Sequence, residues 1–174
     1  MRHRLPFSTD HLRPILSLAR TVVFSLPRNP LALIRAYRIA DNSGLFDQTY
    51  YQTQLTKPLS NGQDPLVHYL TADAETRADP HPLFDQAFYC AHGLIDRVKN
   101  ETPLTHFLRI GCHKNIDPHP LFDSSFYLDK YPDVAEQGIP PAIHFVRFGL
   151  GEGRKCHPLF DADYYTKLNP DGVA

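Results

Sequence analysis

The ten histidines of this 174-residue chain are the side chains best suited to metal binding or proton transfer. Two groups of them recur with a constant 38-residue step. Zinc needs its ligands at about 2 Å, whereas packed helices lie roughly 10 Å apart, so members of one group cannot share an ion. We expect each histidine of the first group to be partly buried and to bond a neighbouring backbone group or carboxylate, whereas those of the second group could bind a metal only singly and weakly. The groups are His68, His106 and His144, and His81, His119 and His157.

The three cysteines offer little metal chemistry. Cys90, Cys112 and Cys156 occupy different places in the 38-residue interval and show no Cys-x-x-Cys spacing. The pairs Cys112-His113 and Cys156-His157 are the best soft-ligand candidates, and we interpret them as structural. We therefore predict no metal and no cofactor. An odd cysteine count does not indicate a disulfide framework and fits a reducing cytoplasm. A single disulfide between two of the three cysteines remains as an alternative.

Asp161-Ala162-Asp163 matches the Asp-x-Asp motif with which many glycosyltransferases bind a metal and a nucleotide sugar. Asp161 is, however, the fourth member of a series with Asp47, Asp85 and Asp123, none of which has a second aspartate two positions later. That series reads as helix N-caps. The sequence has no glycine-rich phosphate loop and no catalytic spacing of Ser, His, Asp or Cys. We predict no catalytic residue and no enzyme activity.

Aromatic side chains give the remaining binding candidates. Most of the nine tyrosines and eleven phenylalanines occupy positions typical of a core. The first members of four aromatic pairs are freest to face outward and stack on a sugar, and a Glu-Gly-Arg triplet adds a charged pair. The predicted binding residues are Tyr50, Phe88, Phe126, Tyr164, Glu152 and Arg154.

A 38-residue repeat must position these side chains. Leu-Phe-Asp begins at Leu45, Leu83, Leu121 and Leu159, with the same step each time. In each, the aspartate is predicted to cap a first helix, and the phenylalanine to form a hydrophobic staple with the second aromatic of the following pair. A second helix is predicted to start with proline at its first position (Pro65, Pro103, Pro141). Gly111 and Gly149 are predicted to end that helix as C′ residues.

The fold class predicted from this pattern is all-α: a helical-repeat solenoid of 38-residue helix–turn–helix units with an N-terminal helical leader. Tyr131-Pro132-Asp133-Val134 adds a short capped turn in the third unit. The array spans 44–174, divided into unit 1 (44–81), unit 2 (82–119), unit 3 (120–157) and a partial unit (158–174).

The leader, residues 1–43, differs from the array in charge. It holds seven arginines and two aspartates, a net +5, whereas positions 44–174 hold 11 basic and 17 acidic side chains, a net −6. The total of −1 argues against a nucleic-acid binder. We read the leader as a basic amphipathic helix that either caps the first unit or lies on an anionic membrane surface. No apolar run reaches the ~20 residues of a membrane span, and we expect a cytoplasmic protein, in one alternative peripheral to the inner membrane.

Unit 3 resembles a bacterial repeat family. The residues that carry the resemblance are Leu121-Phe122-Asp123, Tyr131-Pro132-Asp133-Val134, His144-Phe145, Glu152-Gly153-Arg154 and His157-Pro158-Leu159-Phe160-Asp161. Such repeats occur in tandem beside glycosyltransferase and surface-polysaccharide biosynthesis domains. Units 1 and 2 lack the Glu-Gly-Arg triplet, and Asp73 replaces the glycine in unit 1.

The resemblance implies a non-catalytic interaction module that binds a glycosyltransferase or another polysaccharide-assembly protein. Two alternatives remain: a glycan-binding module, and a fragment of a glycosyltransferase whose catalytic domain lies outside this sequence. The chain stops just after Asn169-Pro170-Asp171, the counterpart of Tyr131-Pro132-Asp133, so we expect a longer parent in the second case.

Overall fold

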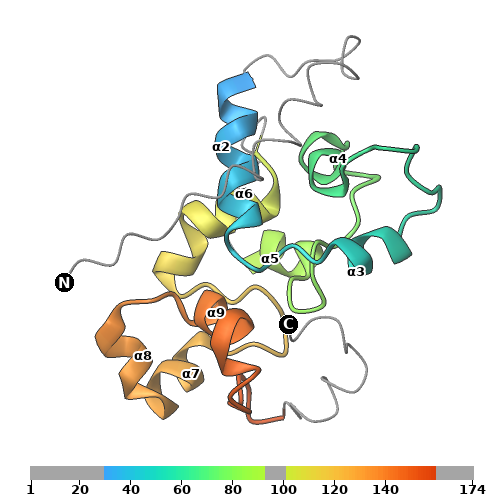
Figure 1. Ribbon diagram of the computed structural model, residues 1–174. Coiled ribbons are helices and arrows are strands. Elements are labelled where there is room, and N and C mark those ends of the chain that lie inside the picture. The colour runs from blue at the N-terminus through green and yellow to red at the C-terminus, as the bar shows by residue number, and fades with distance from the viewer. Residues whose placement is uncertain (1–29, 93–100, 160–174) are drawn as a thin grey trace.

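The computed structural model describes residues 30–92 and 101–159, which form short helices and no β-sheet (Figure 1). The first leader helix, Asp161, Asp163 and Tyr164 lie outside these ranges. Among the described residues, no helix combines the length and apolar composition needed to cross a bilayer. The α-helices are α2 (Pro30–Asp41), α3 (Gln48–Thr53), α4 (Pro65–Thr71), α5 (Gln86–His92), α6 (Pro103–Arg109), α7 (Ser124–Lys130), α8 (Pro132–Gln137) and α9 (Pro141–His144), with a 3₁₀ turn η2 (Gly111–Lys114) and a π-helical turn η3 (Phe145–Gly149).

The first helix of each described unit begins at the predicted cap. Asp47, Asp85 and Asp123 each accept a hydrogen bond from the backbone amide three residues later, at 2.8 Å in every case. These bonds satisfy amides that have no partner inside the helix. The predicted staples also form, with ring centroids 5.4 Å apart for Phe46–Tyr51 and Phe84–Tyr89, and 6.0 Å apart for Phe122–Tyr127.

The second helices begin with proline, as predicted. Pro65, Pro103 and Pro141 are the first residues of α4, α6 and α9. The Asp64 and Thr102 side chains cap α4 and α6, whereas Pro140 gives α9 no side-chain cap. Buried apolar side chains of these helices join the staple rings in a single core.

The prediction that a C′ glycine ends the second helix holds in position for Gly111, which follows the C-cap Ile110 of α6, and was wrong for Gly149, which lies within η3. Neither has the positive φ of a C′ glycine, and both are needed because an aromatic ring lies too close. A Cβ at Gly111 would collide with the Tyr89 hydroxyl, and one at Gly149 with the Tyr127 hydroxyl. Helices α4 and α6 end at equivalent residues, Thr71 and Arg109, but Ala72 is extended whereas the chain of unit 2 continues into η2, so Asp73 follows a different backbone path from Gly111.

The segment that follows the second helix of each unit, called the connector below, is hydrogen-bonded to the start of the first helix of the same unit. The backbone amides of Asp47, Asp85 and Asp123 donate to the carbonyls of Pro80, Pro118 and Cys156, at 2.8, 3.0 and 2.9 Å. The connector aspartates then reach the next unit: Asp79 accepts from the Gln86 amide and Asp117 from the Ser124 amide. The first-turn amides of α5 therefore donate to carboxylates of units 1 and 2, and those of α7 donate to carboxylates of units 2 and 3.

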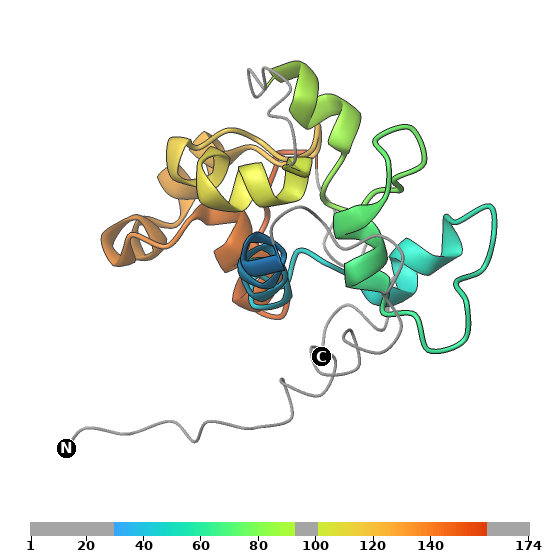
Figure 2. The same cartoon turned by 90° about the horizontal axis from the view of Figure 1, so that it is seen from above.

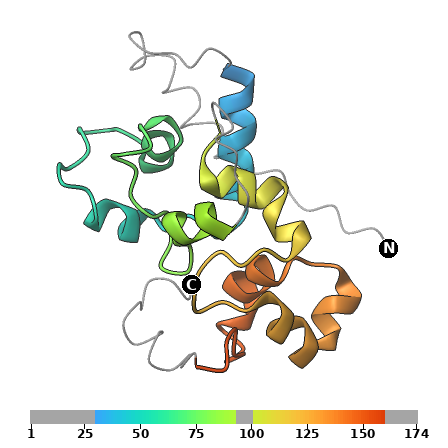
Figure 3. The ribbon, with the colours of Figure 1, turned by 180° about the vertical axis from the view of Figure 1, so that it is seen from behind.

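Helix α2 lies among the three units. It packs against α4 and α6, and the Tyr37 hydroxyl donates to Asp64 at 3.0 Å. The turn after α2 meets unit 3, where Arg147 donates to the Asn42 carbonyl. Seen from above, α2 is viewed end-on with the units around it (Figure 2), and from behind it lies beside α6 (Figure 3).

Candidate functional site

Three tyrosine–histidine pairs recur through the core. The hydroxyls of Tyr51, Tyr89 and Tyr127 lie 2.7, 2.8 and 2.9 Å from Nδ1 of His68, His106 and His144. In every pair the tyrosine comes from the first helix of the unit and the histidine from the second, so the bond fastens the two helices together. These histidines were expected to bond a backbone group or a carboxylate; each bonds a tyrosine hydroxyl instead.

Burial shifts the pKa values of the three tyrosines and of His68 and His144. Burial raises the pKa of Tyr51 to about 12 and also raises the pKa values of Tyr89 and Tyr127. Burial likewise lowers the pKa of His68, and that of His144 with a smaller contribution from Arg154. In the Tyr51–His68 and Tyr127–His144 pairs both partners therefore favour their neutral forms, so these two pairs are suited to holding helices together and poorly suited to proton transfer near neutral pH.

The connector histidines form a second recurring device. Nδ1 of His81, His119 and His157 accepts a hydrogen bond from the backbone amide two residues later, at 3.0, 3.0 and 3.1 Å. This bond shapes the turn that leads into the next Leu-Phe-Asp segment. Burial lowers the pKa of His81 to about 4 and lowers that of His119.

Three of the predicted sugar-binding aromatics, Tyr50, Phe88 and Phe126, lie among the described residues; all three are half-buried, and the latter two contact residues of their own helix. The Phe88 ring stacks on His92 with centroids 4.2 Å apart, and Lys130 Nζ lies 5.2 Å from the Phe126 ring centroid. Tyr50 lies near three carboxylates; its pKa is raised by burial and by Asp79, Asp85 and Asp47.

Glu152 and Arg154 come together in unit 3 with two residues that the prediction left out. Arg154 binds Asp133 through both terminal nitrogens, at 3.0 and 2.8 Å, and its Nε binds Glu152. Its guanidinium lies 4.7 Å from the centroid of Tyr131, whose hydroxyl accepts from the Lys155 amide at 2.8 Å. The hydrogen bonds from Arg154 lower the pKa of Asp133, so the carboxylate stays charged opposite the guanidinium.

This cluster explains why two separated motifs occur in one unit. Tyr131-Pro132-Asp133 begins α8, and Glu152-Gly153-Arg154 lies in the connector, yet their side chains interlock. Units 1 and 2 have neither motif. Their joint presence in unit 3 was the sequence signal that could have placed Tyr131 and Asp133 beside Arg154.

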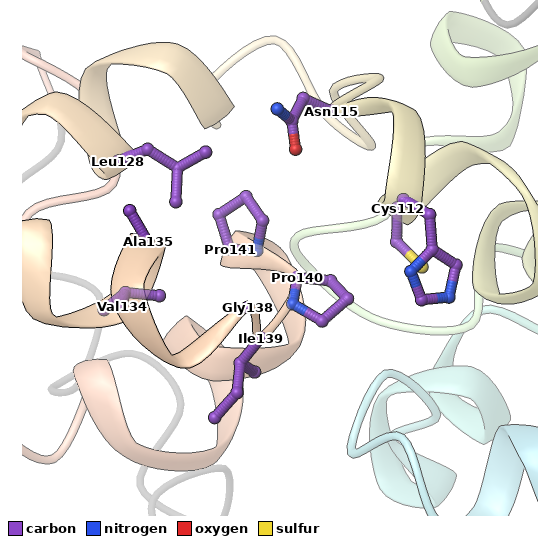
Figure 4. A pocket seen from close by; sticks show the side chains of 10 residues that line it. Cys112, Asn115, Leu128, Val134, Ala135, Gly138, Ile139, Pro140 and Pro141 are labelled. Carbon is purple, nitrogen blue, oxygen red and sulfur yellow. The ribbon is translucent and has the colours of Figure 1, made fainter.

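A shallow hollow of about 210 Å³ lies where unit 2 meets unit 3 (Figure 4). The η2 turn forms one side through Cys112 and Asn115, and α7, α8 and the Pro140-Pro141 segment form the other. The Asn115 backbone has φ of +53°, which an asparagine adopts more readily than most residues. Most of the lining residues have apolar side chains, and none of them is a carboxylate.

The cysteines are all free thiols. Cys112 Sγ contacts the Leu108 carbonyl and Cys156 Sγ the Leu121 carbonyl, so each has its own structural partner. Burial raises the pKa of Cys112 to about 11 and that of Cys156 to about 12, which disfavours the thiolate that binds metal. Within residues 30–92 and 101–159, no three His, Cys, Asp or Glu side chains are grouped to hold a metal ion.

Comparison with protein-family models, with curated proteins and with solved structures finds no match to this chain.

Proposed function

We propose that this chain is a non-catalytic helical-repeat module that binds a protein of bacterial surface-polysaccharide synthesis, such as a glycosyltransferase. The recurrence of the same contacts in three successive units is the observation that carries the proposal. A cap, a staple, a tyrosine–histidine bond and a connector bond appear in each unit at the same relative positions. Tandem units of this kind form extended surfaces for other proteins.

The units are stacked, in this proposal, as a short solenoid curved around α2. Bonds between neighbouring units support stacking: Gln86 of unit 2 donates to the Ala78 carbonyl of unit 1, and the Leu104 amide donates to the Tyr69 hydroxyl. Contacts of α2 with α4 and α6, and of Asn42 with Arg147, support the curvature.

The engagement of the reactive side chains supports a non-catalytic role. The recurring histidines bind tyrosine hydroxyls or backbone amides, and the recurring aspartates bind helix-terminal amides. A group already engaged in this way would have to break a structural bond before it could act on a substrate. The resemblance of unit 3 to repeats beside glycosyltransferases supports the choice of partner and a cytoplasmic location.

Crosslinking in the cells that express the chain tests the proposal. The full chain is the bait, and crosslinked peptides are identified by mass spectrometry. We expect a glycosyltransferase or polysaccharide-export protein linked to exposed lysines of the array, such as Lys57, Lys114 and Lys155. The matched bait lacks residues 1–29 and keeps α2, because α2 packs against the array.

Two results would contradict the proposal. The first is that the only specific partners belong to another process, or are all lost when residues 1–29 are removed. The second is turnover of nucleotide-sugar donors by the purified chain, which would make it an enzyme. Retention of a glycan by the purified chain, without a protein partner, would favour the glycan-binding alternative.

A further inference from the structure

Helix α2 has two unlike faces. Leu33, Ala36, Tyr37 and Ala40 are partly or fully buried toward the array. The opposite face of α2 is a stripe of four exposed residues whose successive spacings of four, three and one keep them on one side of the helix: Leu31, Arg35, Arg38 and Ile39. Leu31 is 66% exposed and Ile39 42% exposed, so two large apolar side chains face solvent beside two exposed arginines.

Positive charge gathers around this stripe. Arg147 of unit 3 reaches the turn after α2 and adds a third arginine, whereas the sequence of α2 itself carries one carboxylate, Asp41. By sequence, positions 44–174 carry a net −6. An anionic surface would attract the three arginines and repel this acidic remainder, which favours the orientation with the outward stripe toward that surface.

We propose that the outward stripe of α2, Leu31, Arg35, Arg38 and Ile39, binds the surface of an anionic membrane. The combination of apolar and cationic side chains favours lipid as the occupant. Leu31 and Ile39 can enter the boundary of the acyl chains, while the arginines extend their charged ends to the phosphate headgroups. Few apolar side chains take part, so the association is reversible and salt-dependent. This inference is independent of the proposed protein partner.

Flotation of the purified full chain with vesicles tests the inference. Vesicles of equimolar phosphatidylglycerol and phosphatidylcholine are compared with vesicles of phosphatidylcholine alone. We expect binding to the anionic vesicles and little to the neutral ones. The double variant R35Q/R38Q should bind about 25-fold more weakly, because one arginine near an anionic leaflet contributes about 1 kcal/mol, or about fivefold.

Two further variants separate position from total charge. K57Q/K114Q removes the same charge from exposed residues outside α2 and should bind like the wild type. L31S/I39S should weaken binding even at high salt, where the arginine contribution is screened. Circular dichroism checks that each variant is folded.

Several outcomes would overturn the inference. They are equal binding of the wild type to neutral and anionic vesicles, equal binding by R35Q/R38Q and wild type, and equal loss in K57Q/K114Q. If R35Q/R38Q leaves vesicle binding unchanged but loses an acidic partner in the separate crosslinking experiment, the stripe is a protein interface instead. The assay contains only chain and lipid, so its failure leaves the proposed protein partner standing.

Discussion

At the scale of single residues, two tyrosine hydroxyls each exclude a Cβ atom from a neighbouring backbone position, which must therefore be glycine. Tyr89 Oη binds His106 and also occupies the space in which a Cβ of Gly111 would stand. The same arrangement recurs at Tyr127, His144 and Gly149. Each glycine is therefore a consequence of the hydrogen bond beside it.

This coupling predicts a non-additive pair of substitutions. Gly111→Ala should destabilise the protein by roughly 2–3 kcal/mol, because the new methyl group must displace the Tyr89 ring. Tyr89→Phe alone should cost roughly 1–2 kcal/mol, because His106 loses its partner. In the double variant the hydroxyl is gone, so Gly111→Ala should cost clearly less, as measured by urea unfolding.

Gly151→Ala is the matched control for that cycle. Its nearest neighbour would be the Phe148 carbonyl at an ordinary 3.5 Å, and its φ is not positive. We expect a change within about 0.5 kcal/mol. Strict additivity of Gly111→Ala and Tyr89→Phe would contradict the explanation given for the glycine.

The connector histidine His81 predicts a pH dependence of stability. Its pKa is about 4 in the fold and 6.5 for the free group, so the folded state prefers the neutral ring. The stabilisation is complete above pH 6.5 and is lost as the pH falls from 6.5 toward 4, by up to about 3 kcal/mol. His81→Asn keeps an acceptor for the Leu83 amide, because asparagine makes the same type of turn. The variant should reduce the dependence of stability on pH, because asparagine does not titrate.

Unfolding in urea between pH 7 and pH 5 measures the effect. The exposed His113, replaced by asparagine, serves as the control and should leave the slope of the wild type intact. An unchanged slope in His81→Asn would show that the acid sensitivity arises elsewhere.

At the scale of elements, the sequence predicted what local chemistry determines. The caps Asp47, Asp85 and Asp123, the staple rings and the helix-starting prolines depend on residues within one turn. The tyrosine–histidine bonds span 17 residues, so spacing alone could not show which atoms face each other. The role of Gly111 was missed for the same reason, since it depends on the ring of Tyr89. The position of α2 depends on contacts with Asp64 and Arg147, far along the chain.

Helix α8 provides a prediction about a single element. Arg154 connects it to the connector through both oxygens of Asp133 and lies over the Tyr131 ring. Arg154→Lys loses the paired geometry and most of the stacking, so the amides of α8 should exchange with deuterium faster than in the wild type. The amides of α7 should change less. Glu152→Gln, which leaves the Asp133 contact in place, should have the smaller effect; equal effects would contradict the dominant role of Asp133.

Helix α2 predicts a contrast between adjacent positions. Ala40 is fully buried against the array, whereas Ile39 faces outward. Ala40→Glu should lower stability by roughly 3 kcal/mol, because it forces a charge into the packed face. Ile39→Glu should leave thermal stability almost unchanged while weakening membrane binding. Similar melting temperatures for both variants would mean that α2 is not packed in solution.

At the scale of the whole molecule, α2 determines how far unfolding spreads. A linear array transmits stability only between neighbours, but here one helix and its following turn touch all three units. A defect within unit 2 that spares the contact of η2 with α9, such as Tyr89→Phe, should therefore loosen unit 3 as well. Hydrogen exchange at the Phe145 and Tyr127 amides should accelerate along with exchange in α6, and urea should unfold the helices in one transition. If the unit 3 amides keep wild-type protection while α6 opens, the units behave as independent neighbours and α2 does not join them into one cooperative body.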